Sequence, residues 1–203
     1  MLNEQEKFWL GKFGNKYIKR NFKKNRVSNR KYFFKKILKN YKSIKSILEF
    51  GCNQGLNLKA LHLVNSKYQL SGIDINSKAI KQLNKWGKAK SYLSSVSKFS
   101  SKKKYDLTFC KGLLIHINPN QLHKVYKNLY KHSKKYILIA EYYSPQPTKI
   151  KYRGYNNKLF KRDFAGEILK KYKNLSLVEY GFHYHGDKNG QGDDDNWFLL
   201  KKK

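Results

Sequence analysis

A glycine-containing turn after a short apolar stretch is the first feature of the sequence that could do chemistry. Residues 46–52 read Ser-Ile-Leu-Glu-Phe-Gly-Cys and predict a buried strand, and residues 56–64 predict a helix. Gly51 and Gly55 stand between these elements, where glycine lets the backbone turn sharply and approach a ligand closely. Their spacing is GxxxG and not the GxGxxG of dinucleotide-binding proteins, so the turn favours a ligand without a pyrophosphate.

A carboxylate stands at the end of the next predicted strand, which covers residues 68–75. Asp74 closes this strand, and an acidic side chain at such a position can accept hydrogen bonds from both hydroxyl groups of a ribose. The alternatives are an ordinary tight turn for the two glycines and an N-terminal helix cap for Asp74. Taken together, the two motifs predict a nucleoside-binding site.

Further polar side chains follow the predicted strands of the second half of the chain, at 105–114 and 136–143. Open α/β sheets bind ligands at the carboxyl ends of their strands. His116 and Glu141 are candidate general bases there, although a satisfied core imidazole and a structural ion pair are the respective alternatives. The candidate residues for binding a substrate at this edge are Tyr142, Tyr143, Tyr152, Arg153, Arg162, Asp163 and His183.

Metal and redox chemistry find little support in the sequence. His183 and His185 alternate along one predicted strand, but no third ligand stands at a defined spacing, so we expect a polar hairpin or a substrate rim and no metal site. Cys52 and Cys110 lack the spacing of zinc or redox sites. We expect both to be buried free thiols.

The order of the predicted elements indicates the fold class. Strands at 46–52, 68–75, 89–96, 105–114 and 136–143 alternate with helices at 56–64, 77–86, 119–132 and 162–172, after two amphipathic helices at 4–21 and 29–42. The last two strands, 175–185 and 197–201, leave no room for a helix between them and should form a hairpin. We expect one α/β domain over residues 1–203, a Rossmann-like doubly wound, seven-stranded, mostly parallel sheet with a C-terminal antiparallel hairpin and N-terminal helices; residues 1–43 form a helical lid and 44–203 the core.

The composition limits the partners. The formal net charge is +32, but only five of the 45 basic residues are Arg, the residue that base readout favours. We therefore expect at most nonspecific nucleic-acid binding driven by charge. No apolar run is long enough to cross a membrane and the chain does not begin like a secretory signal, so we expect a cytoplasmic protein without a membrane partner. The sequence indicates no oligomeric state.

The two nucleoside-site motifs resemble those of a known superfamily. Glu49-Phe-Gly-Cys-Asn-Gln-Gly-Leu-Asn57 followed by Gly72-Ile-Asp-Ile-Asn76 is similar to motifs I and II of class I S-adenosylmethionine (SAM)-dependent methyltransferases. More narrowly, residues 6–21, 111–119, 139–145, 152–154 and 159–166 resemble the pseudaminic acid biosynthesis-associated methylase family, and this similarity spans nearly the whole chain.

The resemblance implies SAM as the methyl donor and a small-molecule acceptor. Arg153 and Arg162 favour an anionic acceptor, such as a nonulosonic (pseudaminic-type) sugar or its nucleotide conjugate. An RNA- or DNA-modifying methyltransferase and a noncatalytic SAM-binding subunit are the alternatives. Many class I enzymes carry an acidic residue for the adenine amine after the third strand, where this sequence has Ser94 and Ser95. The residues placed at the cofactor are Gly51, Cys52, Gly55, Asp74, Ser94, Ser95, Lys111, Gly112, Trp9, Tyr17 and Arg20.

Overall fold

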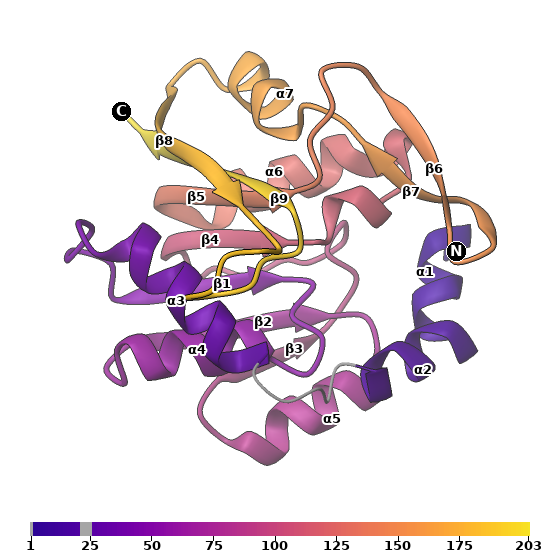
Figure 1. Cartoon of the computed structure of the whole chain (residues 1–203), viewed down its shortest axis with the longest axis horizontal. Helices are drawn as coiled ribbons and strands as arrows, with labels where there is room; N and C mark the ends of the chain where they lie inside the picture. Colours follow the sequence, from indigo (N-terminus) through magenta and orange to yellow (C-terminus); the bar gives the residue numbers. More distant parts are fainter. Residues whose placement is uncertain (1, 21–25) are drawn as a thin grey trace.

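A seven-stranded sheet forms the centre of the protein, in a computed structural model that describes residues 2–20 and 26–203 (Figure 1). Its strands are β1 (Ser46–Phe50), β2 (Gln69–Asp74), β3 (Lys90–Leu93), β4 (Tyr105–Lys111), β5 (Ser133–Glu141), β8 (Leu175–His183) and β9 (Asp195–Lys202). Their order is β3-β2-β1-β4-β5-β9-β8. Strands β1 to β5 are parallel, and β9 is antiparallel to both β5 and β8. The predicted mostly parallel sheet with a C-terminal antiparallel hairpin is therefore confirmed.

Helices cover both faces of this sheet. One face packs against α3 (Arg26–Leu38), α4 (Leu56–Val64) and α5 (Ser77–Trp86), and the other packs against α6 (Leu122–His132) and α7 (Phe164–Lys171). Side chains alternate between the faces along each strand, so Ile47 packs on the α3 face and Leu48 on the α6 face. The same alternation decides which way the polar residues at the strand ends point.

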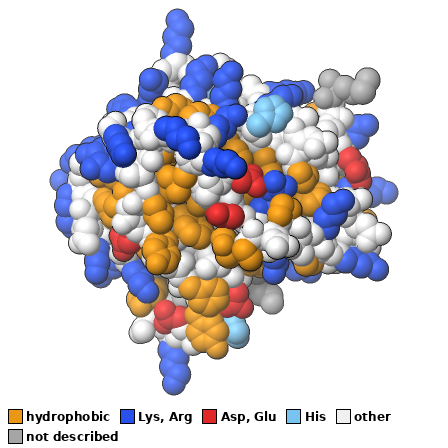
Figure 2. Space-filling view, turned by 90° about the horizontal axis from the view of Figure 1, so that it is seen from above, with side chains coloured by type: hydrophobic (Ala, Val, Ile, Leu, Met, Phe, Trp, Pro, Cys, Tyr) orange, Lys and Arg blue, Asp and Glu red, His pale blue; other side chains and the backbone are white. Residues whose placement is uncertain are grey.

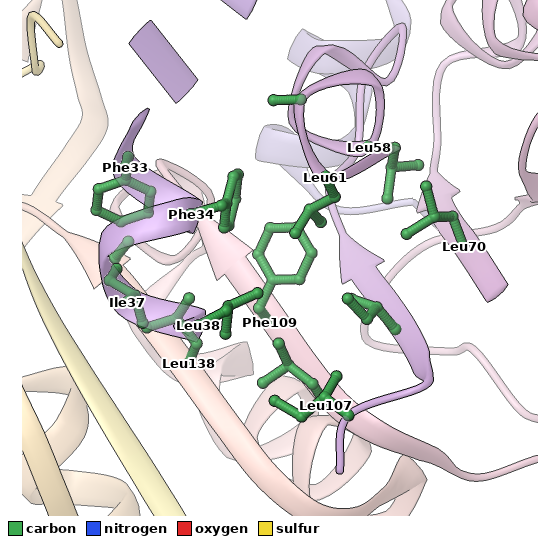
Figure 3. Packing of buried hydrophobic residues seen from close by; sticks show 14 of the residues in the cluster. Phe33, Phe34, Ile37, Leu38, Leu58, Leu61, Leu70, Leu107, Phe109 and Leu138 are labelled. Atoms are coloured by element: carbon green, nitrogen blue, oxygen red, sulfur yellow. The ribbon is translucent and has the colours of Figure 1, made fainter. Parts of the chain in front are cut away.

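The packing of α3 against the sheet positions one edge of the site described below. Figure 3 shows aromatic and aliphatic side chains of α3 facing side chains of α4 and the sheet. The rings of Phe34 and Phe109 lie edge to face, with 5.4 Å between their centroids, and both are fully buried. Burying a side chain of this size stabilises the fold by roughly 1.5–3 kcal/mol. Arg30 stands one helical turn before Phe34 and is held by this packing at the carboxyl edge of the sheet.

The N-terminal segment forms two helices, α1 (Glu4–Leu10) and α2 (Lys12–Arg20), where the sequence predicted one helix over 4–21. A capping box of Asn3 and Glu6 begins α1. Gly11 ends it in an extended conformation, and this residue breaks the predicted continuous helix. The predicted end at residue 21 lies outside the described residues.

A second, two-stranded sheet follows β5, between the predicted strand 136–143 and the predicted helix 162–172, where the sequence analysis predicted no strand. Strands β6 (Thr148–Tyr152) and β7 (Tyr155–Lys161) pair antiparallel around a two-residue turn, Arg153-Gly154. Both turn residues have positive φ angles, 50° and 87°, as a tight hairpin turn requires. Asn or Gly usually precedes the glycine of such a turn, so an Arg there gives little sequence signal. Figure 1 shows this hairpin beside α1, and the rings of Phe8 and Tyr155 lie 5.1 Å apart.

Basic side chains are spread over the surface. Figure 2 shows Lys and Arg on all sides of the face seen from above, with hydrophobic side chains between them. Several of the few acidic residues are buried, among them Glu49, Glu141 and Asp195, which leaves the surface still more basic. Within residues 2–20 and 26–203, no helix is long and apolar enough to cross a membrane, and no three His, Cys, Asp or Glu side chains are grouped as a metal site would need.

Candidate active site

A cavity of about 160 Å³ opens at the carboxyl ends of the central parallel strands. Its walls come from the turn after β1, the ends of β2 and β4, the segment after β3, and the N-terminal helices. This is the edge at which open α/β sheets bind ligands, because the loops that follow adjacent strands separate there. Nine of the predicted cofactor-binding and catalytic residues line this cavity: Trp9, Tyr17, Gly51, Cys52, Asp74, Ser95, Lys111, Gly112 and His116.

The turn between β1 and α4 has the backbone that its glycines predict. Gly51 and Gly55 have φ angles of 74° and 79°, in the left-handed region that side chains with a Cβ rarely adopt. The backbone N–H groups of Gly51 and Cys52 both donate to the carbonyl oxygen of Ile73, which ties the turn to β2. Gly51 and Cys52 line the cavity, whereas Gly55 begins α4 just behind it.

Asp74 joins the loops after β1 and β2. Its Oδ2 accepts a hydrogen bond from the backbone N–H of Asn53 at 2.7 Å, and its Oδ1 accepts one from Asn76 at 2.8 Å. Burial raises the pKa of Asp74, and these two hydrogen bonds counteract that rise. Each carboxylate oxygen keeps a lone pair, so Asp74 can also accept from a ligand hydroxyl in the cavity.

Glu49 and Asn57 present unused hydrogen-bond acceptors to the cavity. Asn57 donates to Oε1 of Glu49 at 2.6 Å, but Oε2 of Glu49 and Oδ1 of Asn57 are buried without a hydrogen-bond partner. Both residues line the cavity. Burial raises the pKa of Glu49 to about 8, against the effects of Asn57 and the nearby charges of Arg30 and Lys111. Buried polar atoms without a partner are uncommon, and a ligand ammonium group would fit this pair because its charge favours the ionised form of Glu49, which accepts through Oε2.

The N-terminal helices close one side of the cavity and are tied to the core by hydrogen bonds. The side chain of Asn76 donates to the backbone oxygen of Trp9 at 3.0 Å, and the side chain of Gln54 donates to the backbone oxygen of Ile18 at 3.2 Å. Trp9 and Tyr17 face the cavity, with their rings 5.3 Å apart and edge to face. Arg20 does not line the cavity; its guanidinium lies 5.4 Å from the ring centre of Tyr17.

His116 stands between the cavity and the β6–β7 hairpin. It ends η1, a short 3-10 helix over Leu114–His116, and is buried. Its ring lies 4.8 Å from the rings of Trp9 and Tyr152, and its Nδ1 is 2.7 Å from the backbone oxygen of Lys158. Because a carbonyl oxygen can only accept, Nδ1 carries the proton and Nε2 keeps its lone pair. Burial lowers the pKa of His116 to about 4, so the ring is neutral at physiological pH.

Glu141 lies away from the cavity. Its carboxylate accepts hydrogen bonds from the backbone N–H groups of Leu113, Leu114 and Ile115 at 2.9, 3.0 and 3.4 Å, at the start of η1. Glu141 follows Ile137 and Ile139 on the α6 face, as the period of a strand requires. Burial raises its pKa to about 7. The position of Glu141 therefore favours a structural role, in which it supports the segment that carries His116, over the predicted role as a general base.

Lys111 reaches the cavity but is engaged in a buried ion pair. Its Nζ lies 2.6 Å from Oδ1 of Asp195, and Asp195 lies 3.4 Å from Nδ1 of His183. Although burial acts in the opposite direction, the charge of Lys111 lowers the pKa of Asp195 to about 2. His183, a predicted acceptor-binding residue, is thus packed below α3 against Phe33 and does not line the cavity.

The structure brings some of the predicted acceptor residues together and separates others. Burial and the charges of Asp193 and Asp195 raise the pKa of Tyr142 to about 12, and the ring of Tyr152 lies 4.8 Å from that of His116. The guanidinium of Arg153 lies 5.7 Å from the ring centre of Tyr152. The remaining predicted residues have other contacts: Arg162 pairs with Glu167 at 2.7 Å, Asp163 caps α7, and the exposed ring of Tyr143 lies beside Phe198.

Several residues that line the cavity were not singled out in the sequence. Among them are the polar residues Gln5, Glu6, Arg30, Glu49, Asn53 and Asn57. The sequence does contain a signal for Glu49, which is an acidic residue inside the apolar run of β1. Burying a carboxylate without a partner costs free energy, so its presence in such a run indicates a partner or a ligand. For Gln5 and Glu6 no local signal existed, since they belong to an ordinary amphipathic helix.

Known methyltransferases resemble this chain in part of its sequence and in its fold. Residues 47–136 match the family model described as a methyltransferase domain. No curated protein sequence matches the chain. Among solved structures, the plantazolicin methyltransferase BpumL in complex with S-adenosylhomocysteine (SAH) is similar, with 18% identity, a TM-score of 0.67, and coverage of 98% of this chain and 94% of that chain.

Two further solved structures have the same fold. Magnesium protoporphyrin IX methyltransferase from Synechocystis PCC 6803 with bound SAM has 12% identity, a TM-score of 0.68, and coverage of 100% of this chain and 99% of that chain. The 1,6-didemethyltoxoflavin-N1-methyltransferase of Burkholderia thailandensis with bound SAH has 11% identity, a TM-score of 0.69, and coverage of 98% of this chain and 87% of that chain. The chain has the Rossmann-like fold of these enzymes, and with the domain match this supports a SAM-dependent methyltransferase.

Proposed function

We propose that this chain is a SAM-dependent methyltransferase that methylates a small, polar, anionic acceptor, such as a nonulosonic (pseudaminic-type) sugar or its nucleotide conjugate. One observation carries the proposal: a glycine turn, a ribose-type carboxylate and two buried, unpaired acceptor atoms line a single cavity. The free, buried thiols of Cys52 and Cys110 fit the reducing cytoplasm that the sequence predicts.

The residues of the cavity fit the parts of SAM. Oε2 of Glu49 and Oδ1 of Asn57 would accept from the methionine ammonium group, and Asp74 would accept from the ribose hydroxyls. Arg30, which lines the same cavity, would face the methionine carboxylate. The N-terminal helices would act as a lid, with Trp9 and Tyr17 on its inner side.

The acceptor side combines tyrosines with cations. The guanidinium of Arg153 lies 5.7 Å from the ring centre of Tyr152, and the guanidinium of Arg20 lies 5.4 Å from the ring centre of Tyr17. Arg153 is exposed and held at a hairpin turn with a positive φ angle, a strained position that is typical of functional residues. Two guanidinium groups beside hydroxyl-bearing rings suit a carboxylate or phosphate on a polar acceptor. The three solved structures are named for plantazolicin, magnesium protoporphyrin IX and 1,6-didemethyltoxoflavin, all of them acceptors other than nucleic acid.

When bound, SAM supplies a methyl group that is already activated on a sulfonium centre. The protein must then hold the acceptor in line and remove its proton, and positioning of this kind accounts for much of the rate. His116 is placed for the second task, because its Nδ1–H is fixed by the oxygen of Lys158 and Nε2 keeps its lone pair; with a pKa of about 4 it is a weak base, and acts by position more than by basicity. Glu141 would act as a positioning residue through the backbone of residues 113–115.

Calorimetry with SAH tests the donor, and mass spectrometry tests the acceptor. We expect micromolar-range binding of SAH, weakened by roughly 1–3 kcal/mol in Asp74→Ala because the ribose hydroxyls lose a charged acceptor. Asp187→Ala, in the loop between β8 and β9 and not among the residues that line the cavity, is the matched control and should bind SAH like the wild type. An extract of anionic metabolites incubated with isotopically labelled SAM should then yield a labelled product. Absence of SAH binding by the wild type would refute the assignment.

A further inference from the structure

The segment after β3 carries no acidic side chain toward the cavity. Residues 94–101 read Ser-Ser-Val-Ser-Lys-Phe-Ser-Ser, and Ser95, Val96 and Ser97 line the cavity. The adenine of a nucleoside bound to Asp74 has to lie near this segment, because β3 is the strand next to β2. Its exocyclic amine donates two hydrogen atoms, yet this wall offers no carboxylate to accept them.

The N-terminal helix brings a carboxylate to the same place. Ser95 Oγ donates a hydrogen bond to Oε1 of Glu6, although the two residues are 89 positions apart in the sequence. Oε2 of Glu6 accepts from the backbone N–H of Asn3 at 2.9 Å, and the side chain of Asn3 accepts from the backbone N–H of Glu6 at 2.8 Å. Glu6 lines the cavity, and each of its oxygens keeps a further lone pair. The carboxylate is therefore held in place and can still accept.

The neighbouring residue supplies an acceptor that has no partner at all. The Gln5 side chain is 4% exposed and lines the cavity. Its Nε2 donates to the backbone oxygen of Asn157 at 3.1 Å, while its Oε1 is buried without a hydrogen-bond partner. A buried carbonyl oxygen left unpaired costs free energy that a ligand donor would recover. Such an oxygen, on a cavity-lining residue of the helix that also holds Glu6, suits a ligand N–H.

We propose that α1 recognises the exocyclic amine of adenine through the carboxylate of Glu6 and the side-chain oxygen of Gln5. The inference rests on the proposed function, since it assumes a SAM-type nucleoside in the cavity. The N-terminal lid then selects the base as well as covering the cofactor, and it replaces the acidic residue that is missing after β3.

S-inosylhomocysteine, in which a carbonyl oxygen replaces the amine and N1 carries a hydrogen, tests this directly. The wild type should prefer SAH by about 10-fold or more, because an acceptor that faces the carbonyl oxygen loses its hydrogen bond and the N1–H can satisfy at most one of the two. Glu6→Gln can keep the helix cap, and its amide can donate to the oxygen of inosine, so the preference should fall toward unity. Gln5→Ala should also reduce it, and this variant leaves the capping box intact.

Lys7→Gln is the matched control. Lys7 lies on the same helix, is exposed and does not line the cavity, so this variant should keep the full preference for SAH. Calorimetry gives both affinities, and circular dichroism confirms that each variant is folded. Equal affinity of the wild type for the two compounds would overturn the inference, as would an unchanged preference in both Glu6→Gln and Gln5→Ala. Binding of neither compound by the wild type would overturn the proposed function and the inference with it.

Discussion

The Nδ1 atom of His116 lies 2.7 Å from the backbone oxygen of Lys158, and this contact fixes the tautomer of the imidazole. Lys158 belongs to β7, so the β6–β7 hairpin orients the candidate base. The hairpin is also joined to α1 through the ion pair of Lys158 with Glu4 and the hydrogen bond from Gln5 to Asn157. His116, the β6–β7 hairpin and α1 are therefore joined by direct contacts.

His116 should remain neutral well below the usual titration range of histidine. Because burial lowers its pKa from 6.5 to about 4, the imidazole stays able to accept a proton down to about pH 5. We expect no acid limb near pH 6.5 in the rate of methyl transfer, and an NMR titration should show an imidazole that does not protonate between about pH 8 and pH 5. A His116 signal that titrates near pH 6.5 would contradict this.

Replacement of His116 should separate catalysis from cofactor binding. His116→Asn should lower methyl transfer by about 10²-fold or more, the usual effect of losing a positioned base, and should bind SAH nearly as the wild type does. Calorimetry and single-turnover rates measure the two effects. A variant that stays folded and transfers methyl groups at the wild-type rate would remove His116 from the chemistry.

Glu49→Gln should stabilise the ligand-free protein at high pH and weaken its cofactor binding. The pKa of Glu49 is raised from 4.5 to about 8, so the folded state holds a proton that the unfolded state has lost in this range. Stability from this group is therefore present below about pH 4.5 and is lost as the pH rises toward 8. Between about pH 4.5 and pH 8, the melting temperature of Glu49→Gln should rise relative to that of the wild type. The variant should also bind SAH less tightly. A difference that is independent of pH would argue against a titrating Glu49.

Glu141→Gln should cost stability without changing the pH dependence of methyl transfer. The amide can no longer accept from all three backbone N–H groups of residues 113–115, and a buried unsatisfied group costs roughly 1–3 kcal/mol. For a chain of this size, each 1 kcal/mol lowers the melting temperature by roughly 2–4 °C. Scanning calorimetry measures this loss. An unchanged melting temperature together with a displaced pH–rate profile would instead restore Glu141 as a base.

Nucleic-acid binding should depend on charge alone. With a formal net charge of +32 spread over the surface, the protein should bind duplex DNA and tRNA without sequence preference at low salt, and this binding should collapse as salt rises because it depends on counterion release. Fluorescence anisotropy across salt concentrations measures it. Selective binding that persists near physiological salt would favour the nucleic-acid-modifying alternative.

Much of the fold was predictable because local patterns encode it. The apolar runs of β1 and β4, the glycines of the turn after β1 and the short spacing of the last two strands each depend on neighbouring residues only. The β6–β7 hairpin was missed because Arg153 occupies a turn position that usually holds Asn or Gly. The direction of Glu141 was available in principle, since it shares its strand face with Ile137 and Ile139.

The sequence by itself determined the succession of strands and helices along the chain, the glycine turn and the placement of Asp74 at a strand end, because backbone geometry and hydrophobic alternation act over a few residues. Only the tertiary structure decided which distant groups meet: Ser95 with Glu6 across 89 residues, and His116 with Lys158 across 42. Those pairings follow from how the apolar faces of α1 and the hairpin pack against the core. Packing of this kind is nondirectional and approximately proportional to buried area, so it leaves no local mark at the polar residues that it brings together.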